Sequence, residues 1–149
     1  MRRHCELIAA AALALTCAAA HAEPRATPAA SIEGAWTLET KIKESIGCVI
    51  RGEATVAPAR NGRHAVHIEI AQTCPQSGSF WARESCEATV RAQRVAMTCT
   101  VIASESGGYR PDTFDLEHAA AGVMTGRLVD TGVWNTDVTW RRASAALVS

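Results

Sequence analysis

The sequence has no excess of charge of one sign. Its 149 residues include 15 Lys and Arg against 15 Asp and Glu, which gives a formal net charge of 0 at pH 7. A chain of this kind lacks the positive surface that attracts nucleic acid or anionic lipid. We therefore expect no nucleic-acid partner and no binding to charged membranes. The length fits one domain.

Catalytic motifs are also missing. The sequence contains no G-x-S-x-G, H-E-x-x-H, P-loop or dinucleotide-binding glycine pattern. It has no C-x-x-C, and no Asp or Glu joins a histidine at the spacing of metal ligands. The sequence thus predicts no catalytic residue, no metal site and no cofactor. A hydrolase without a recognisable motif is the alternative.

The longest apolar run, Leu7 to Ala20, is shorter than the ~20 residues that span a bilayer as a helix. Two arginines precede this run, and Ala20-His21-Ala22 follows it. This order is typical of a secretory signal peptide, here residues 1–22. Residues 23–31 contain two prolines and predict a flexible arm. We expect a periplasmic or secreted protein with no stable membrane anchor after cleavage.

From Ile32 onward, apolar and polar residues alternate with the period of a β-strand. Eight such segments follow one another, separated by turns such as Asn61-Gly62. The pattern predicts an all-β fold over residues 32–143, with a frayed tail at 144–149. We expect an eight-stranded antiparallel up-and-down meander that closes into a barrel, with a two-sheet sandwich as the alternative. Residues 80–85 are ambiguous, with a single helical turn as one interpretation.

Four cysteines remain after the leader, an even number that predicts two disulfides in a secreted chain. A two-residue turn at residues 92–93 would place Cys86 opposite Cys99. A turn at Asn61-Gly62 would leave Cys48 one residue out of register with Cys74, which a bulge can absorb. We therefore predict Cys48–Cys74 and Cys86–Cys99. All four cysteines are expected at one end of the barrel, so Cys74–Cys86 with Cys48–Cys99 stays open.

The two ends of the predicted barrel carry short motifs. Gly34-Ala35-Trp36 opens the first strand, and Trp140-Arg141-Arg142 ends the last. This resembles the calycin group, which includes the lipocalins and avidins. The resemblance implies that Trp36 and Trp140 fill the floor of the barrel and that Arg142 packs across Trp36 where the barrel closes. It also implies that a small apolar molecule is held in the cup.

Five residues are candidates for lining a ligand site in that cup; Trp134, nearer the other end, is the better ligand candidate, whereas a hydrogen-bonded core residue is the simpler interpretation of His118. The five are Trp134, Met97, Phe114, Leu116 and His118. Small residues at inward positions are expected to leave room for the ligand, among them Gly52 and Gly126. The first functional hypothesis is therefore a binding module for a small hydrophobic ligand.

The alternative hypothesis is a protein-interaction role, such as an inhibitor of an extracytoplasmic protease or an envelope chaperone. Phe80 and Trp81 lie beside a loop, and Tyr109 lies in the longest loop of the chain. These three aromatic residues are the candidates for contacting a protein partner. The arm at residues 23–31 would contribute to the same interaction.

Overall fold

The structure is a computed structural model that describes residues 31–40, 47–129 and 135–144. The predicted signal peptide, the arm up to residue 30 and the tail beyond residue 144 lie outside the described residues. So does Trp134. Every regular element in the described part of the chain is a β-strand. This part contains no helix of the length and apolarity needed to cross a membrane.

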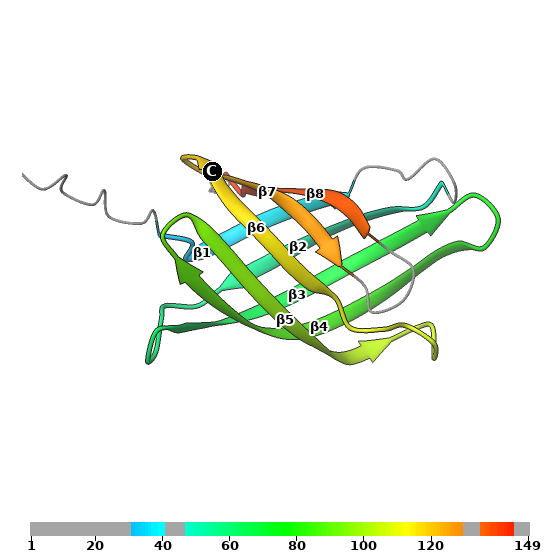
Figure 1. Ribbon diagram of the computed structural model, residues 1–149. Helices are drawn as coiled ribbons and strands as arrows, with labels where there is room; N and C mark the ends of the chain where they lie inside the picture. Colours follow the sequence, from blue (N-terminus) through cyan, green and yellow to red (C-terminus); the bar gives the residue numbers. More distant parts are fainter. Residues whose placement is uncertain (1–30, 41–46, 130–134, 145–149) are drawn as a thin grey trace, which may run out of the picture.

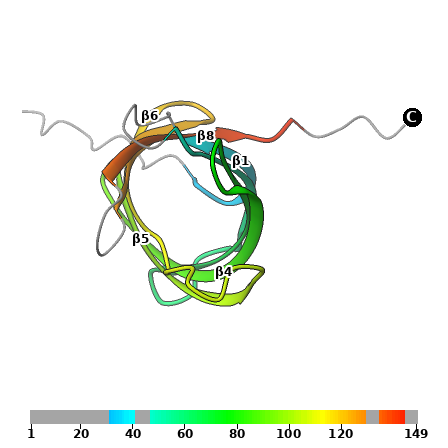
Figure 2. The same cartoon turned by 90° about the vertical axis from the view of Figure 1, so that its right-hand side faces the viewer.

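Eight antiparallel strands form a closed barrel in which each strand pairs with the next and the last pairs with the first (Figures 1 and 2). The strands are β1 (Gly34–Thr40), β2 (Val49–Val56), β3 (Arg63–Cys74), β4 (Gly78–Arg91), β5 (Arg94–Ser104), β6 (Thr113–Ala120), β7 (Val123–Val129) and β8 (Asn135–Arg142). The prediction of a closed meander is confirmed, and the sandwich alternative is wrong. Closure pairs β1 with β8 and leaves no free sheet edge between them.

The alternation in the sequence places apolar side chains inside the barrel and charged ones outside. The β3 residues Val66, Ile68 and Ile70 are buried, whereas His67 and Glu69 between them are exposed. Cross-strand ion pairs cover the outer face, as between Arg51 and Glu39, whose atoms are 3.0 Å apart. Such exposed pairs contribute little to stability, so the fold rests mainly on its interior.

The segment at residues 80–85 is strand rather than a single helical turn. It belongs to β4, which pairs with β3 along its length and is the longest strand of the barrel. Pairing with β3 supplies the backbone hydrogen bonds that would otherwise favour a local turn. The register between β4 and β5 shifts at Arg83 and Glu84. Because the alternation runs on through the segment, Ala82 and Glu84 join Cys86 on the inward face.

The two disulfides join Cys48 to Cys74 and Cys86 to Cys99, as predicted. Cys86 and Cys99 are directly opposite each other on β4 and β5. The expectation that all four cysteines share one barrel end is wrong. Cys74 pairs with Gly78 at the start of β4, whereas Cys86 lies well inside that strand opposite Val66. Two disulfides indicate an oxidising, extracytoplasmic environment.

One end of the barrel, here called the floor, is closed around Trp36. The guanidinium of Arg142 lies 4.6 Å from the centre of the Trp36 ring and donates hydrogen bonds to the carbonyl oxygens of Glu33 and Ser31. The indole N–H of Trp36 donates to the carbonyl of Ile32 over 2.7 Å. Gly34 has φ +111°, and a Cβ there would lie 2.9 Å from Arg142 Nη1. The barrel is thus compatible with a calycin-like fold.

Candidate functional site

The lower part of the barrel interior is filled by side chains. Met97, Phe114 and Leu116, three of the candidates for lining a ligand site, are buried in the hydrophobic core. Phe114 packs edge-on against Trp140 with ring centres 5.3 Å apart. The structure therefore places these three residues in the packed core above the floor, where close packing leaves little free volume.

The inward glycines do not make room in this interior. A Cβ at Gly126 would overlap the carbonyl oxygen of Asp115 and lie 2.7 Å from the Cα of Leu116. A Cβ at Gly52 would likewise overlap the carbonyl oxygen of Glu69. The backbone of the neighbouring strand occupies the space that a side chain would need. These glycines allow adjacent strands to approach, and the expectation that they enlarge the cup is wrong.

His118 is the candidate lining residue whose surroundings differ from those of the core. Its ring meets the Trp36 ring edge-on, with centres 6.4 Å apart, so it lies near the floor. Its backbone N–H donates to the carbonyl of Gln93. The side-chain Nε2 is buried and has no hydrogen-bond partner.

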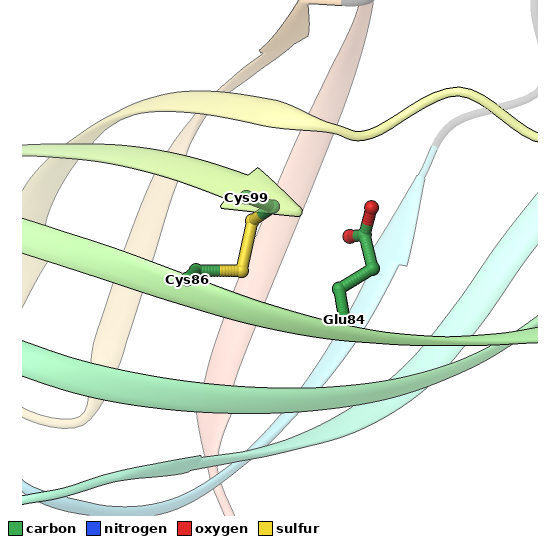
Figure 3. A group of neighbouring side chains, drawn as sticks. All are labelled: Glu84, Cys86 and Cys99. Carbon is green, nitrogen blue, oxygen red and sulfur yellow. A yellow bond between two sulfur atoms is a disulfide. The ribbon is translucent and has the colours of Figure 1, made fainter. Parts of the chain in front are cut away.

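Higher in the barrel, Glu84 projects from β4 into the interior beside the disulfide (Figure 3). Only 1% of this residue is exposed. Its Oε1 accepts a 3.0 Å hydrogen bond from the backbone N–H of Asp112, and its Oε2 has no hydrogen-bond partner. Asp112 is also buried and accepts a 2.7 Å hydrogen bond from the hydroxyl of Tyr109. We call Glu84, Asp112 and Tyr109 the acidic cluster.

The electrostatics of the acidic cluster favour a protonated Glu84. Burial raises the pKa of Glu84 to about 8, and the negative charge of Asp112 acts in the same direction. The hydrogen bond from the Asp112 backbone opposes this shift because it stabilises the carboxylate. At pH 7 the Glu84 carboxyl is therefore mostly neutral. A neutral carboxyl can donate one hydrogen bond as well as accept others.

Buried polar atoms without partners concentrate inside the barrel. Within the described residues, three buried side-chain polar atoms lack a hydrogen-bond partner: Glu84 Oε2, His118 Nε2 and Trp140 Nε1. All three belong to side chains that point inward. Most buried polar groups in proteins are hydrogen-bonded to protein or to ordered water. The interior thus offers hydrogen-bonding capacity that the described protein atoms do not use.

Glu84 also forms a compact group with the disulfide. One carboxylate oxygen of Glu84 and the sulfurs of Cys86 and Cys99 lie within 4.8 Å of one another, and all three residues are buried (Figure 3). Metals are bound by thiolate sulfur, and these two sulfurs are bonded to each other. In the oxidised protein the group therefore supplies one carboxyl oxygen rather than three metal ligands.

The aromatic residues predicted to contact a partner are placed on two different faces. Phe80 and Tyr109 pack edge-on with ring centres 5.9 Å apart, so they connect β4 to the loop that carries the acidic cluster. Trp81, the next residue on β4, points outward and is 43% exposed. The guanidinium of Arg83 lies 5.3 Å from the centre of the Trp81 ring. Trp81 is therefore separated from the other two aromatic side chains.

Trp81 and Arg83 border a hollow on the outer surface. The hollow has a volume of about 1170 Å³ and crosses β8 and β1 to β4. Its side chains are mostly the outward ones of these strands, such as Glu39, Arg51 and Arg141. A barrel of twisted, tilted strands narrows at its waist, which makes its outer surface concave along the strands. The hollow is therefore a feature of the outer wall and not of the interior.

Sequence interpretation missed Glu84 and Asp112. Glu84 has the same parity along the chain as Cys86 and Ala88, so it faces inward once β4 is extended back to Gly78. The alternation around Cys86 could have shown this if the segment had been assigned to a strand. Asp112 belongs to the loop before β6, and no sequence pattern predicts its contact with a residue 28 positions away.

Comparison with known proteins adds no functional information. The chain matches no known protein-family model, and no curated protein is similar to it.

Proposed function

We propose that the protein binds a small molecule inside its barrel, in the periplasm or outside the cell. The observation that carries this proposal is the buried, unpartnered Oε2 of Glu84, an inward side chain of β4. A ligand with an apolar body and at least one polar group would satisfy this atom. The resemblance to lipocalins and avidins at Gly34-Ala35-Trp36 and Arg142 supports the same function.

The proposed ligand site lies beside Glu84 on the inward face of β4. Small inward residues lie nearby, namely Ala82 on β4 and Ala54 on β2, and both are buried. Trp36, Ala54, Ile68 and Glu84 form one row of paired positions from β1 to β4. The site thus combines an apolar wall with one hydrogen-bonding carboxyl, which is the usual composition of a small-molecule pocket.

The full-length chain exported by its own leader should carry a small molecule that native mass spectrometry detects. We expect one adduct per protein that denaturation releases. Glu84→Ala should weaken its retention about ten-fold or more, because the substitution removes a buried polar contact. Glu87→Ala is the matched control, since Glu87 lies on the same strand but faces outward and pairs with Arg63. Absence of an adduct after exposure to envelope extracts would contradict the proposal.

A second candidate function is binding of a partner protein through the outer wall. Ile102 is 61% exposed and lies on β5 beside the register shift at Arg83, close in the sheet to Trp81. Trp and Arg are enriched among residues that dominate binding energy at protein interfaces. The guanidinium of Arg83 lies against the Trp81 ring. Arg83 takes part in none of the three salt bridges of the described residues. These features favour a partner that presents an acidic side chain beside an apolar one.

Trp81→Ala separates the two candidate functions. If the protein inhibits an extracytoplasmic protease through this wall, Trp81→Ala should raise the inhibition constant about 30-fold, as expected for the loss of a central interface residue. Glu84→Gln should leave inhibition unchanged, because Glu84 faces the interior. A panel of envelope proteases assayed with the full chain provides the measurement. Equal inhibition by wild type and Trp81→Ala would exclude the outer wall around Trp81 as the protease-binding surface.

A further inference from the structure

The acidic cluster contains two buried carboxyl groups that interact through both the backbone and the side chain of Asp112. Glu84 accepts the Asp112 N–H, and both residues are less than 5% exposed. Buried carboxyl groups are rarely found without hydrogen bonds or positive charge nearby. Glu84 Oε2 is nevertheless buried with no hydrogen-bond partner. This oxygen is the point at which the cluster can meet a ligand.

We propose that the polar end of the ligand is a protonated amine that hydrogen-bonds Glu84 Oε2, an inference that rests on the proposed binding function. An ammonium group presents only donors, whereas the two carboxyl groups of the cluster offer mainly acceptors. Its positive charge would offset the negative charge of the cluster at a position shielded from water. A ligand carboxylate would instead add a further negative charge beside Asp112.

The surroundings of Glu84 suit the rest of such a ligand. Its paired neighbours on β3 and β5 are Ile68 and Val101, which are apolar and do not titrate. Asp112 contacts it from the loop before β6 and is itself bonded by Tyr109, and the Cys86–Cys99 disulfide lies beside it. Asp112 and Tyr109 are thus the titratable groups around Glu84 among the described residues. An apolar chain attached to the amine would contact the aliphatic wall.

Proton exchange distinguishes an amine from a neutral ligand. The pKa of Glu84 is raised to about 8, so an amine that pairs with the carboxylate must displace a proton below that pH. Affinity should then rise about ten-fold from pH 7 to pH 9, while an alkylamine with a pKa near that of lysine, about 10.4, stays charged. A neutral hydroxyl that accepts a hydrogen bond from protonated Glu84 should show the opposite dependence.

The test compares n-octylamine, 1-octanol and octanoate, which share one apolar chain and differ in the head group. Isothermal titration of the full-length protein in two buffers of different ionisation enthalpy measures affinity and proton release together. We expect octylamine to bind at least ten-fold more tightly than octanol and to release close to one proton at pH 7. Octanoate should bind more weakly than either.

Glu84→Gln provides the decisive variant because it keeps the size of the side chain and removes its charge. It should abolish proton release and reduce octylamine affinity to that of octanol, whereas Glu87→Gln should change neither. A thermal melt verifies that each variant folds. Equal, pH-independent binding of octylamine and octanol would overturn the amine inference and leave the binding function intact. Failure of all three probes, together with no adduct in native mass spectra, would overturn both.

Discussion

Replacing Glu84 with glutamine should raise the free energy of unfolding by about 3 kcal/mol at pH 7 and about 4 kcal/mol at pH 8. Glu84 has a pKa raised from 4.5 to about 8 by burial and by the charge of Asp112. In the unfolded chain the carboxyl ionises above pH 4.5, whereas in the folded barrel it stays protonated up to about pH 8. The unfolded state therefore binds fewer protons over this window, and wild-type stability falls as pH rises.

The direction of the Glu84 pKa shift sets the pH range over which stability changes. For a carboxyl whose pKa is raised on folding, the contribution to stability is complete below pH 4.5 and is lost as pH rises toward 8. The slope is at most about 1.4 kcal/mol per pH unit. Glutamine does not titrate, so the difference between Glu84→Gln and wild type should be small at pH 4 and largest near pH 8.

Urea denaturation of both proteins at pH 4, 6 and 8 measures this effect. Glu87→Gln serves as the control, because Glu87 is an exposed residue of the same strand that pairs with Arg63. A difference between Glu84→Gln and wild type that stays constant across the three pH values would contradict the proposed protonation of Glu84. A lower stability of Glu84→Gln at pH 8 would contradict it more strongly.

Gly126→Ala should destabilise the barrel by about 3 kcal/mol and lower Tm by roughly 10 °C. The added Cβ would overlap the Asp115 carbonyl oxygen and press on the Cα of Leu116. Both contacts are with backbone, so no side-chain rotation relieves them, and β6 and β7 must move apart. Alanine also lowers the conformational entropy of the unfolded chain, which by itself would stabilise the fold, so a net loss reports how closely the two strands approach.

Thermal denaturation followed by circular dichroism provides the measurement. Gly107→Ala is the matched control, since a Cβ at Gly107 meets nothing within 4 Å, and its Tm should change little. Similar Tm values for Gly126→Ala and Gly107→Ala would show that β6 and β7 are not held this close. Larger residues at Gly126 are unsuited to testing ligand binding, because they would disturb the wall before they filled the cup.

The sequence alone predicted the antiparallel meander and favoured the disulfide pairing that the structure has, while the alternative pairing stayed open. Period-two alternation assigns each strand an inner and an outer face, and short turns without crossover helices require antiparallel neighbours. The register then follows from the turns. Arg60 bridges Arg63 beside the Asn61-Gly62 turn, and the β2–β3 ladder runs one residue out of that register. This is the one-residue offset that brings Cys48 and Cys74 into range.

Barrel closure was also predictable, because its motifs lie at the two ends of the pattern. In a closed meander the start of the first strand must meet the end of the last, so Trp36 and Arg142 become neighbours from topology alone. The alternation of apolar and polar residue types did not identify residues 80–85 as a strand, because polar and aromatic residues occur there although the inward and outward alternation of positions continues. There, pairing with the full length of β3 overrides the weak local preference.

Only the tertiary structure decided how closely the strands approach inside the barrel and which buried polar groups meet there. Alternation shows that Gly126 faces inward, but how close β6 approaches depends on the curvature of the whole barrel. The contact between Glu84 and Asp112 joins β4 to a distant loop, and the raised pKa of Glu84 exists only once the surrounding strands exclude water. Strand periodicity is a local property and can be predicted from the sequence. Desolvation and the proximity of side chains across the barrel depend on the assembled fold.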